Sequence, residues 1–492
     1  MVATSYRGVL TNFIWHLNPI SMYKKNSGFV SVLMVIALTA GFSGCEEPAD
    51  EPEQFSPLNT PDWAYNATIY EVNTRQYTEE GTFEAFSEHI PRLQEMGVDI
   101  LWFMPIHPIG EERRKDDYVG DQRPEGEVLG SYYSIKDFFG VNPEFGDDED
   151  FQAVVDKAHE HDMYVILDLV ANHTAWDNPL MDERPELYAT DEDGEFHHPP
   201  GTDWDDVAQL DYDNPETWEY MKEVMEYWVG EFNIDGYRAD VADYVPTQFW
   251  NEARERLDNI KPVFMLAEAE TPEHHEAAFD MSYAWELMHA KNELGQGEMT
   301  AEEYRQLYDE NFDEFPDYAY RMQMTSNHDE NTWDASAVER FGERTKAMAV
   351  LKSTIEGMPL VYNGQEVGLD HNLEFFYKDE ITWDFDSPFM DFYTTLLHLN
   401  RDNSALHNGL HGGDLEWLET NYPDEVMAYI RERNDDKVLT VINLSDESLE
   451  VEIYSEEMVG NFTEIFSDES ETLTTTETFS LDGWDYLVFE AN

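Results

Sequence analysis

Four short apolar runs, each ending in acids, amides or histidines, constrain the fold of this chain more than any other feature. Each run is continuous rather than alternating, which is typical of a parallel strand buried on both faces. The side chains that follow such strands meet at one edge, and in a closed α/β barrel that edge holds the active site. The runs with their polar ends are residues 164–174, 233–243, 263–268 and 322–329.

Arg238 and Asp240 stand two residues apart near the end of the second run. Residues two apart on a strand point to the same side, so the guanidinium and the carboxylate are expected to be neighbours. An arginine beside a carboxylate favours the ionised form and lowers its pKa, which suits a nucleophile at neutral pH. The alternative is a structural ion pair below the barrel rim.

The apolar pattern predicts eight strands separated by helical segments. Helical periodicity covers residues 82–96, interrupted at Pro91 and closed by Gly97, and then residues 148–161 and 214–228. Strands alternating with helices in this way predict a parallel barrel. The strand candidates are residues 67–72, 100–104, the runs ending at Asp168 and Asp240, and residues 263–268, 279–285, 321–327 and 359–364.

In order and in wording, the four polar-ended runs resemble the signature regions of the α-amylase family, glycoside hydrolase family 13. The resemblance extends from about Trp63 to about Gly368. It implies an α/β fold, a TIM (β/α)8 barrel with a small domain inserted after strand three and a C-terminal antiparallel β-sandwich. It also implies a retaining glycosidase whose substrates are α-glucans such as starch and malto-oligosaccharides.

We divide the chain into four parts on this basis. Residues 1–45 are expected to form a leader, 46–62 an acidic tether, 63–402 the catalytic barrel with its insertion at 173–211, and 403–492 the β-sandwich. No helical or strand periodicity persists in the insertion. The last part carries short runs rich in β-branched and aromatic residues, at 426–430, 437–444, 449–454 and 484–490.

Glycoside cleavage with retention needs two carboxyl groups about 5 Å apart, one attacking the anomeric carbon and one protonating the leaving oxygen. Glu268 ends an apolar run, where poor solvation raises a carboxyl pKa and holds the proton. The resemblance assigns Asp240 as nucleophile and Glu268 as general acid/base. It assigns Asp329 as the third acid, which binds sugar hydroxyls and distorts the ring.

Four further residues match sugar-contacting positions of the family. Tyr133 matches a tyrosine that stacks on the sugar ring, although a packing role is an alternative. His173 and His328, each preceded by Asn, match two histidines that hold sugar hydroxyls. Arg238 completes the predicted substrate-binding set.

Asn172 matches a calcium ligand of the family, and oxygen-rich loops suit calcium. The motif usually continues after the nucleophile with a Lys-His pair whose backbone helps that site, whereas this chain has Asp243 and Tyr244. Calcium binding is therefore left open. No organic cofactor is expected.

The replacement of the Lys-His pair by Asp243 and Tyr244 also bears on linkage specificity. Exchanging a cationic donor for a carboxylate or a phenol changes the contacts available to the leaving sugar. A valine directly after the nucleophile, here Val241, resembles the pattern of relatives that cleave α-1,6 bonds. We expect mainly α-1,4 hydrolysis. The alternatives are an α-1,6-glucosidase or neopullulanase-like activity, an α-glucanotransferase, and an inactive sugar-binding homologue. Inactive relatives typically lose one of the three acids, and this chain keeps all three.

The N-terminal residues resemble an export signal. A basic region after Met22 precedes an apolar core at 29–41 that falls short of the ~20 residues a membrane-spanning helix needs. Cys45, the only cysteine, resembles the lipidated residue of a bacterial lipobox, the alternative being an incidental cysteine. We expect an exported protein, anchored by lipid at the outer membrane or cell surface, or otherwise periplasmic or extracellular.

Charge limits the partners of this chain. It has 29 basic and 106 acidic residues, a formal net charge of −77, so nucleic acid is not expected to bind. Self-repulsion on this scale destabilises a compact state unless ions screen it, which indicates adaptation to high salt. A broad cation-binding surface is the alternative. We expect a monomer that contacts membrane only through a lipid on Cys45.

Overall fold

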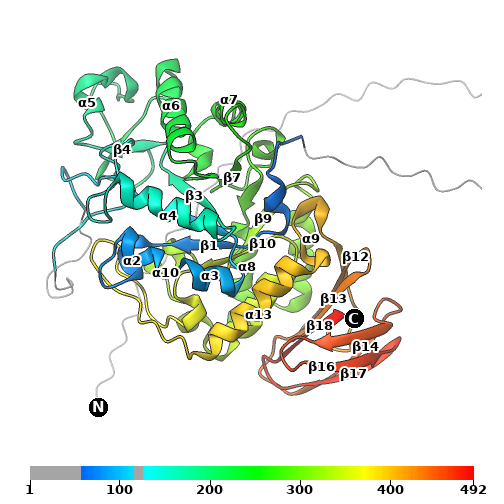
Figure 1. The fold of residues 1–492 in the computed structure, drawn as a ribbon. Helices are drawn as coiled ribbons and strands as arrows, with labels where there is room; N and C mark the ends of the chain where they lie inside the picture. The colour runs from blue at the N-terminus through cyan, green and yellow to red at the C-terminus, as the bar shows by residue number, and fades with distance from the viewer. Residues whose placement is uncertain (1–56, 116–125) are drawn as a thin grey trace, which may run out of the picture. The chain divides into compact units, whose positions relative to one another are not determined.

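Eight parallel strands close into a barrel in the computed structural model, which describes residues 57–115 and 126–492 (Figure 1). Every predicted strand is present, and the predicted barrel is confirmed. The leader with Cys45, and residues 46–56 of the tether, lie outside the described residues. In order around the barrel the strands are β1 (Ile69–Val72), β10 (Met358–Tyr362), β9 (Tyr320–Gln323), β8 (Met281–Tyr283), β7 (Phe264–Ala267), β6 (Gly236–Ala239), β3 (Tyr164–Leu169) and β2 (Ile100–Phe103).

Helices lie between these strands in the chain and surround the barrel (Figure 1). The predicted break at Pro91 divides α2 from α3, because proline is tolerated in the first turn of a helix but not inside one. Gly97 ends α3 in the left-handed conformation, at a φ of 100°. The helices are α1 (Thr74–Tyr77), α2 (Phe83–Ser87), α3 (Ile90–Met96), α4 (Asp148–Glu160), α6 (Pro215–Glu231), α7 (Thr247–Asp258), α8 (Trp285–Gln296), α9 (Ala301–Phe312), α10 (His328–Trp333), α11 (Ala337–Phe341), α12 (Thr345–Thr354) and α13 (Pro388–Asp402).

Alternation along each strand separates the apolar core of the barrel from its polar end. Ile69, Ile166 and Leu266 point inward and pack with Trp102 in a fully buried cluster. Residues two further along point the same way, and the chain places charged residues there. These inward-facing charged residues are Glu71, Asp168 and Glu268, joined by Arg238 of β6.

Gly236 at the start of β6 is required by the close approach of β7. A Cβ atom at this position would lie 1.8 Å from the carbonyl oxygen of Phe264, and the φ of 154° is one that other residues rarely adopt. Only glycine lets the two strands pair here. The pairing sets Arg238 opposite Leu266, two residues before Glu268.

The insertion after β3 contains a small antiparallel pair that the sequence did not predict. Strand β4 (His173–Ala175) pairs with β5 (Val207–Gln209), with His173 opposite Gln209. A short helix, α5 (Leu180–Glu183), lies between them in the chain. Elements of three or four residues are too short to produce a detectable hydrophobic period, which is why the segment looks irregular in sequence.

The C-terminal part is built of antiparallel strands, as predicted. A six-stranded sheet has the order β11-β12-β13-β18-β15-β16, and β14 pairs with β17. Strand β16 lies at one edge, and its first four residues are exposed. The bounds are β11 (Asp414–Trp417), β12 (Val426–Arg433), β13 (Asp436–Asn443), β14 (Leu449–Tyr454), β15 (Gly460–Glu464), β16 (Glu469–Leu473), β17 (Thr476–Leu481) and β18 (Tyr486–Ala491).

Buried polar contacts join this sheet to the barrel helices. The Thr354 and Tyr429 hydroxyls lie 2.6 Å apart, and Arg431 donates from Nη1 to the Ile355 carbonyl oxygen at 3.0 Å. A buried guanidinium needs such acceptors, because leaving it unpaired would cost several kcal/mol. These contacts fix the sheet against the end of α12.

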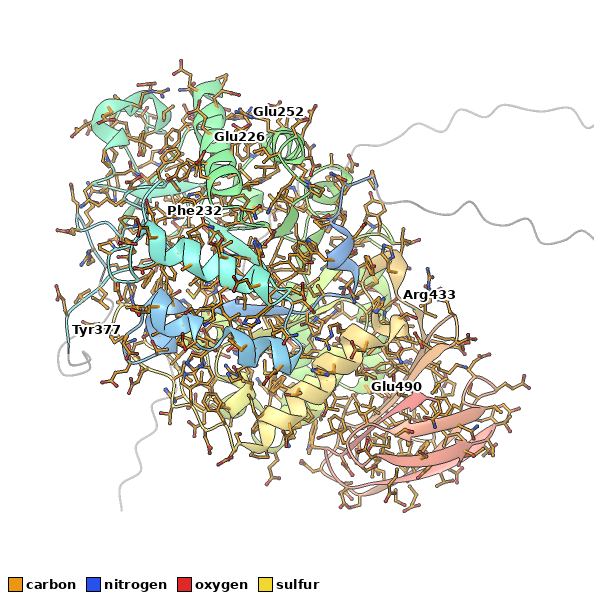
Figure 2. The ribbon with its side chains drawn as sticks, in the orientation of Figure 1. Glu226, Phe232, Glu252, Tyr377, Arg433 and Glu490 are labelled. Carbon is orange, nitrogen blue, oxygen red and sulfur yellow. The ribbon has the colours of Figure 1, made fainter. Side chains whose placement is uncertain are left out.

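The chain has few cations, and some of them are shared between two acids. Lys222 contacts both Glu219 and Glu252, and Arg256 contacts both Glu219 and Glu226. Glu226 and Glu252 extend from α6 and α7 in Figure 2. Among the described residues, no helix has both the length and the apolar character needed to cross a bilayer.

Candidate active site

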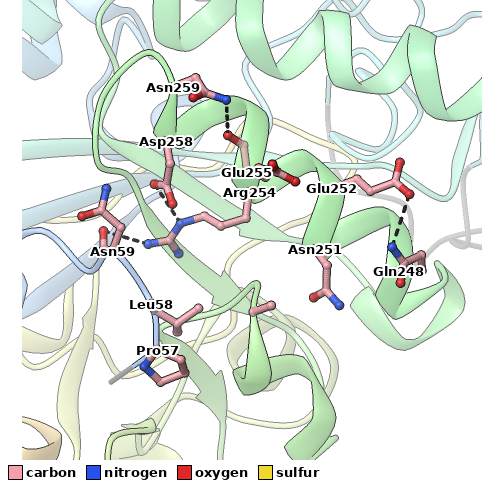
Figure 3. Close-up of a pocket in the computed structure, with 11 residues that line it drawn as sticks. Pro57, Leu58, Asn59, Gln248, Asn251, Glu252, Arg254, Glu255, Asp258 and Asn259 are labelled. Carbon is pink, nitrogen blue, oxygen red and sulfur yellow. Dashed lines mark hydrogen bonds and ion pairs between the residues drawn. The ribbon is translucent and has the colours of Figure 1, made fainter. Parts of the chain in front are cut away.

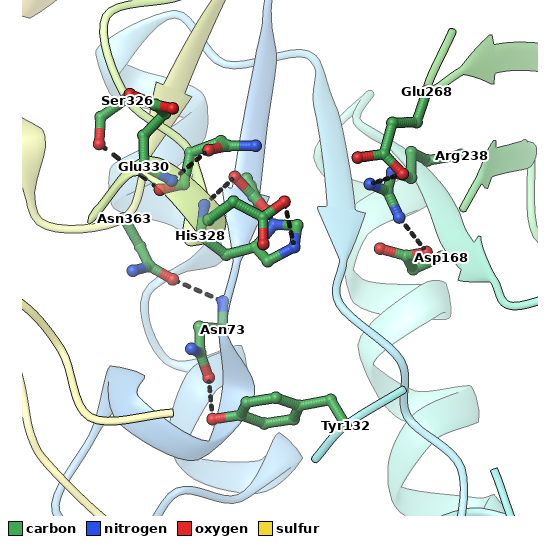
Figure 4. Close-up of polar contacts among 12 residues, drawn as sticks. Asn73, Tyr132, Asp168, Arg238, Glu268, Ser326, His328, Glu330 and Asn363 are labelled. Atoms are coloured by element: carbon green, nitrogen blue, oxygen red, sulfur yellow. Dashed lines mark hydrogen bonds and ion pairs between the residues drawn. The ribbon is translucent and has the colours of Figure 1, made fainter. Parts of the chain in front are cut away.

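Arg238 organises a cluster of charged side chains at the carboxyl ends of the barrel strands (Figure 4). Its Nη1 donates to Asp168 Oδ1 at 2.8 Å and to Asp240 Oδ1 at 3.0 Å. Its Nη2 donates to Glu268 Oε2 at 2.9 Å. The guanidinium is buried, so these ion pairs form away from solvent. One cation thereby holds three carboxylates from three neighbouring strands.

Asp240 and Glu268 lie side by side because both bind the terminal nitrogens of one guanidinium. The Asp240 N–H donates to the Leu169 carbonyl oxygen at 3.0 Å, and the Glu268 N–H donates to the Ala239 carbonyl oxygen at 3.0 Å. Backbone pairing therefore fixes both residues just beyond the ends of β6 and β7. The structure brings these two predicted residues together.

Val241 adopts a strained backbone immediately after Asp240. Its φ of 39° and ψ of 52° lie in the left-handed region, which a β-branched residue rarely enters. In this conformation its N–H donates to Glu268 Oε2 at 2.7 Å. The strained turn thus adds a donor to the carboxyl group of Glu268.

Burial raises the pKa of the acids in the cluster, and Asp240 holds its proton more tightly than the sequence predicted. Burial raises the pKa of Asp240 to about 7 and that of Asp168 to about 6, although Arg238 lowers both. Burial also raises the pKa of Glu268, as predicted. The prediction that Arg238 keeps Asp240 permanently charged is wrong, because desolvation outweighs the attraction to Arg238 and Glu268 adds repulsion. The neighbouring carboxyls therefore share protons near neutral pH.

A second chain of contacts runs from Tyr133 through His328 to Glu71. The Tyr133 hydroxyl donates to Asp168 Oδ2 at 3.0 Å and lies 2.7 Å from His328 Nε2. His328 Nδ1 lies 2.5 Å from Glu71 Oε1, and its Nε2 lies 3.3 Å from Asp329 Oδ2. Burial opposes a charge on His328, but Asp329 and Glu71 raise its pKa to about 9. His328 is therefore a buried cation at neutral pH.

This charge makes the stability contribution of His328 dependent on pH. Because its folded-state pKa lies above the unfolded value, the contribution is complete below about pH 6.5 and is lost as pH rises through about 9. We expect the difference in unfolding free energy between the wild type and His328→Gln to shrink between pH 6 and pH 9.5 in urea titrations. His161→Gln is the control for losing an imidazole elsewhere. A His328→Gln difference that grows over this range would contradict the assignment.

His173 differs from His328 in its charge. Burial lowers the pKa of His173 to about 4, so the ring is neutral at neutral pH. It lies near the Trp204 ring of the insertion, with centroids 5.7 Å apart. His173 can therefore accept or donate a hydrogen bond without a charge, whereas His328 donates from both nitrogens.

The environment of Asn172 does not fit a calcium ion. Its Oδ1, the atom that would bind the metal, accepts a hydrogen bond from Gln209 Nε2 at 2.8 Å. The same Gln209 amide donates to the Leu210 carbonyl oxygen at 3.1 Å. The described residues contain no group of three or more His, Cys, Asp or Glu side chains placed to hold a metal. A neutral amide thus takes the position between oxygens that a cation would need.

Tyr244, rather than Asp243, presents an available side chain after the strained turn. Asp243 Oδ1 accepts hydrogen bonds from Thr271 Oγ1 at 2.7 Å and from His274 Nε2 at 2.9 Å. Tyr244 is 37% exposed and stacks with Trp204, with ring centroids 6.1 Å apart. The predicted change from a cationic donor to a carboxylate or a phenol at this position therefore centres on the Tyr244 phenol.

Three site residues did not emerge from the sequence as candidates. Glu71 pairs with His328, Asp168 pairs with Arg238, and the Tyr283 hydroxyl accepts from Arg238 Nε at 3.3 Å. Glu71 and Asp168 each interrupt an otherwise apolar strand. A lone acid inside a doubly buried strand is expensive unless it is paired, and that is a usable sequence signal.

A separate pocket of about 420 Å³ lies at the other end of the barrel (Figure 3). Its wall joins α7 to residues 57–59, and Arg254 Nη2 donates to the Asn59 carbonyl oxygen at 3.0 Å. Arg254 also pairs with Asp280, which precedes β8, so this pocket is near the amino ends of the strands. It contains none of the predicted site residues.

Comparison with protein families gives matches over most of the chain. The family model for the α-amylase catalytic domain matches residues 52–204 and 191–437. The model for the maltogenic amylase C-terminal domain matches residues 415–488.

Curated relatives and solved structures agree with these matches. The chain is 26% identical to α-amylase MalA of Haloarcula japonica over 414 residues, which cover 80% of this chain and 57% of MalA. It is 25% identical to the maltogenic α-amylase of Bacillus acidopullulyticus over 435 residues, covering 83% of this chain and 70% of that relative.

Among solved structures, the maltogenic α-amylase AmyB of Thermotoga neapolitana matches with a TM-score of 0.77 and 28% identity. This match covers 87% of the present chain and 99% of AmyB. An α-amylase of Lactobacillus plantarum matches with a TM-score of 0.76 and 29% identity, covering 87% and 100%. The barrel, the C-terminal sheet and the family-model match together show that the chain belongs to the α-amylase family, glycoside hydrolase family 13.

Proposed function

We propose that this chain is a retaining glycoside hydrolase that acts on α-glucans, mainly at α-1,4 linkages. The observation that carries the proposal is the shared guanidinium of Arg238, which holds Asp240 and Glu268 next to each other. Adjacent carboxyls suit double displacement, whereas inverting enzymes need a wider gap for water.

The reaction proceeds in two steps. A carboxylate oxygen of Asp240 attacks the anomeric carbon, the bond to the leaving oxygen breaks, and that oxygen takes a proton from Glu268. Water then attacks the anomeric carbon of the glycosyl-enzyme, and Glu268 takes a proton from the water. The bond between Asp240 and the sugar breaks, and Asp240 leaves as a carboxylate. Asp240 forms a bond to the sugar in the first step and loses it in the second, while Glu268 gives a proton in the first step and takes one in the second.

The electrostatics of the cluster support these roles. The pKa of Glu268 is raised by burial, which favours the protonated form that the first step needs. Asp240 must be charged to attack, and Arg238 is the cation that stabilises this form. Charged His328 provides a hydrogen-bond donor and the Tyr133 ring a stacking surface for the sugar, and Asp329 beside them accepts hydrogen bonds from sugar hydroxyls.

Linkage preference is tested by product analysis on starch, pullulan and short malto-oligosaccharides. We expect purified enzyme to cleave maltotetraose faster than panose or isomaltose. The reverse order would favour the α-1,6-glucosidase or neopullulanase-like alternative. If Val241→Ala leaves the ratio of the two activities unchanged, Val241 does not set the preference. No cleavage of any glucan by folded wild type would favour the inactive sugar-binding homologue.

An α-glucanotransferase is the second candidate. The observation in its favour is the stacked pair of Tyr244 and Trp204 near Glu268, since an aromatic surface there would help a sugar acceptor compete with water. Formation of products longer than the supplied malto-oligosaccharide would support this activity. Hydrolysis products alone, at high substrate concentration, would exclude it.

We further propose that the protein is exported and carries a lipid on Cys45. The basic region, the apolar core and the cysteine support this assignment. The wild type is expected to partition with membranes and Cys45→Ser is not. Equal partitioning of the two proteins would contradict the lipid anchor. The proposed state is a monomer without a resident calcium ion, and chelator-treated enzyme is expected to keep its Tm.

A further inference from the structure

One exposed tryptophan stands out beside the site. Trp333 is 55% exposed, more than any other large hydrophobic side chain in the described residues of the barrel. Exposing so large an apolar surface to water is unfavourable. Trp333 is the last residue of α10, the helix that begins at His328.

Helix geometry places Trp333 on the same face as Asp329. The two residues are four apart, so their side chains lie one above the other, about 6 Å apart along the helix axis. Asp329 faces the carboxylate cluster, because its Oδ2 lies 3.3 Å from His328 Nε2, which contacts the Tyr133 hydroxyl beside Asp168. Trp333 therefore stands one turn further from the cluster, along the same line.

A row of aromatic rings connects His328, beside the carboxylate cluster, to Trp333. Tyr133 stacks on His328 with centroids 5.4 Å apart, and the Phe375 ring lies parallel to Tyr133 at 6.4 Å. Trp333 contacts Phe375 at 5.1 Å and Phe376 at 6.1 Å. Phe375 is buried, so it supports Trp333 from behind and leaves the outer part of the indole open.

Hydrogen bonds hold the helix that carries Trp333 in place. Asn331 donates from Nδ2 to the His371 carbonyl oxygen at 3.2 Å and accepts from the Leu373 N–H at 2.8 Å. Asn372 donates to the carbonyl oxygens of Thr332 and Asp334, each at 3.2 Å. The indole is therefore presented by a fixed backbone, and little conformational entropy remains to be lost on binding.

We propose that Trp333 forms a glucosyl-binding subsite for the part of the α-glucan that stays on the enzyme. This inference rests on the proposed function. Glu268 gives its proton to the leaving oxygen, so the leaving sugar lies towards Glu268 and nearby Tyr244. The retained chain extends the other way, past Tyr133 and Asp329. Its next sugar units meet the open part of the Trp333 indole and stack there through their C–H faces.

The subsite makes the effect of Trp333 depend on substrate length. Trp333→Ala is expected to lower kcat/KM on maltohexaose about tenfold, which corresponds to about 1.4 kcal/mol. It is expected to leave kcat/KM on 4-nitrophenyl α-glucoside unchanged, because one glucosyl unit does not reach residue 333. Trp333→Phe keeps a ring and should recover most of the loss. Tyr454→Ala, which removes an aromatic side chain 67% exposed on β14, is the control for a surface effect.

Two outcomes would overturn the subsite. Equal loss on both substrates would mean that Trp333 only holds α10 and Asp329 in place, and no loss on either would mean that the indole does not touch the glucan. Calorimetry in the Glu268→Gln background separates this inference from the proposed function, because binding needs no turnover. In that background, Trp333→Ala should lower the affinity for maltohexaose about tenfold without changing the affinity for glucose. Cleavage of neither substrate by wild type would contradict the proposed function alone.

Discussion

Replacing Asp240 with asparagine is expected to reduce hydrolysis of malto-oligosaccharides by at least about 10³-fold, because the amide cannot form the glycosyl-enzyme bond. The shape of the side chain is kept, and the amide oxygen can still accept from Arg238 Nη1. Burial disfavours the charged form of Asp240, which is why its pKa is raised. Removing that charge is therefore not expected to lower the Tm above pH 7. Initial rates and thermal melts at pH 8 measure both effects.

Asp156→Asn is the matched control, since it makes the same chemical change at an exposed position on α4. It should keep wild-type activity. An Asp240→Asn protein that melts normally and retains more than a few per cent of the activity would exclude Asp240 as the nucleophile. A variant that unfolds would instead show that Arg238 needs this carboxylate for stability, and Glu268→Gln would then test the catalytic pair.

Dialysis from molar potassium chloride into ~0.01 M salt is expected to lower the Tm by roughly 10 °C or more. The reason is the net charge of −77, since the Debye length grows from about 3 Å to about 30 Å and surface acids then repel across much of the molecule. Shared cations such as Lys222 and Arg256 are too few to neutralise the surface. Dissolved ions must therefore provide the charge screening that the few cations of the chain do not.

The choice of added salt distinguishes two explanations for the acidic surface, namely charge screening in high salt and specific cation binding. Choline chloride screens charge without a metal cation, so it should restore the Tm much as potassium chloride does. Full recovery at millimolar calcium chloride would instead indicate specific cation binding. A Tm that is flat from low to molar salt would contradict adaptation to high salt.

The sequence predicted the barrel because each strand is a continuous apolar run with a polar end, a signal that needs no knowledge of distant contacts. It also named Asp240, Glu268 and Asp329, which the structure gathers beside Arg238 and His328. The pKa direction of Asp240 could not be predicted the same way. Arg238 is visible two residues away in the chain, but Asp168 and Glu268 share that cation only after β3, β6 and β7 pair.

The remaining differences have similar causes. The apolar pattern does not predict β16 and β17, because exposed Glu, Ser and Thr residues interrupt it, and it does not predict β15, whose one buried apolar residue is Phe462. Trp333 was missed because its relation to Asp329 depends on the start of α10 at His328. The Gln209 contact with Asn172 joins residues 37 apart, and nothing in the local sequence announces it.

The acidic edge of the C-terminal sheet has a consequence for association between molecules in concentrated salt. Strand β16 exposes Glu469 and Glu471 beside backbone groups that could pair with another chain. Salt weakens repulsion between such edges, so repulsion alone would fail at the salt concentrations in which we expect the protein to be most stable. Burying a carboxylate still requires removing its water, and that cost remains when charges are screened. The edge is therefore expected to resist fibre-like stacking through hydration, in the same salt that we expect to favour the folded barrel.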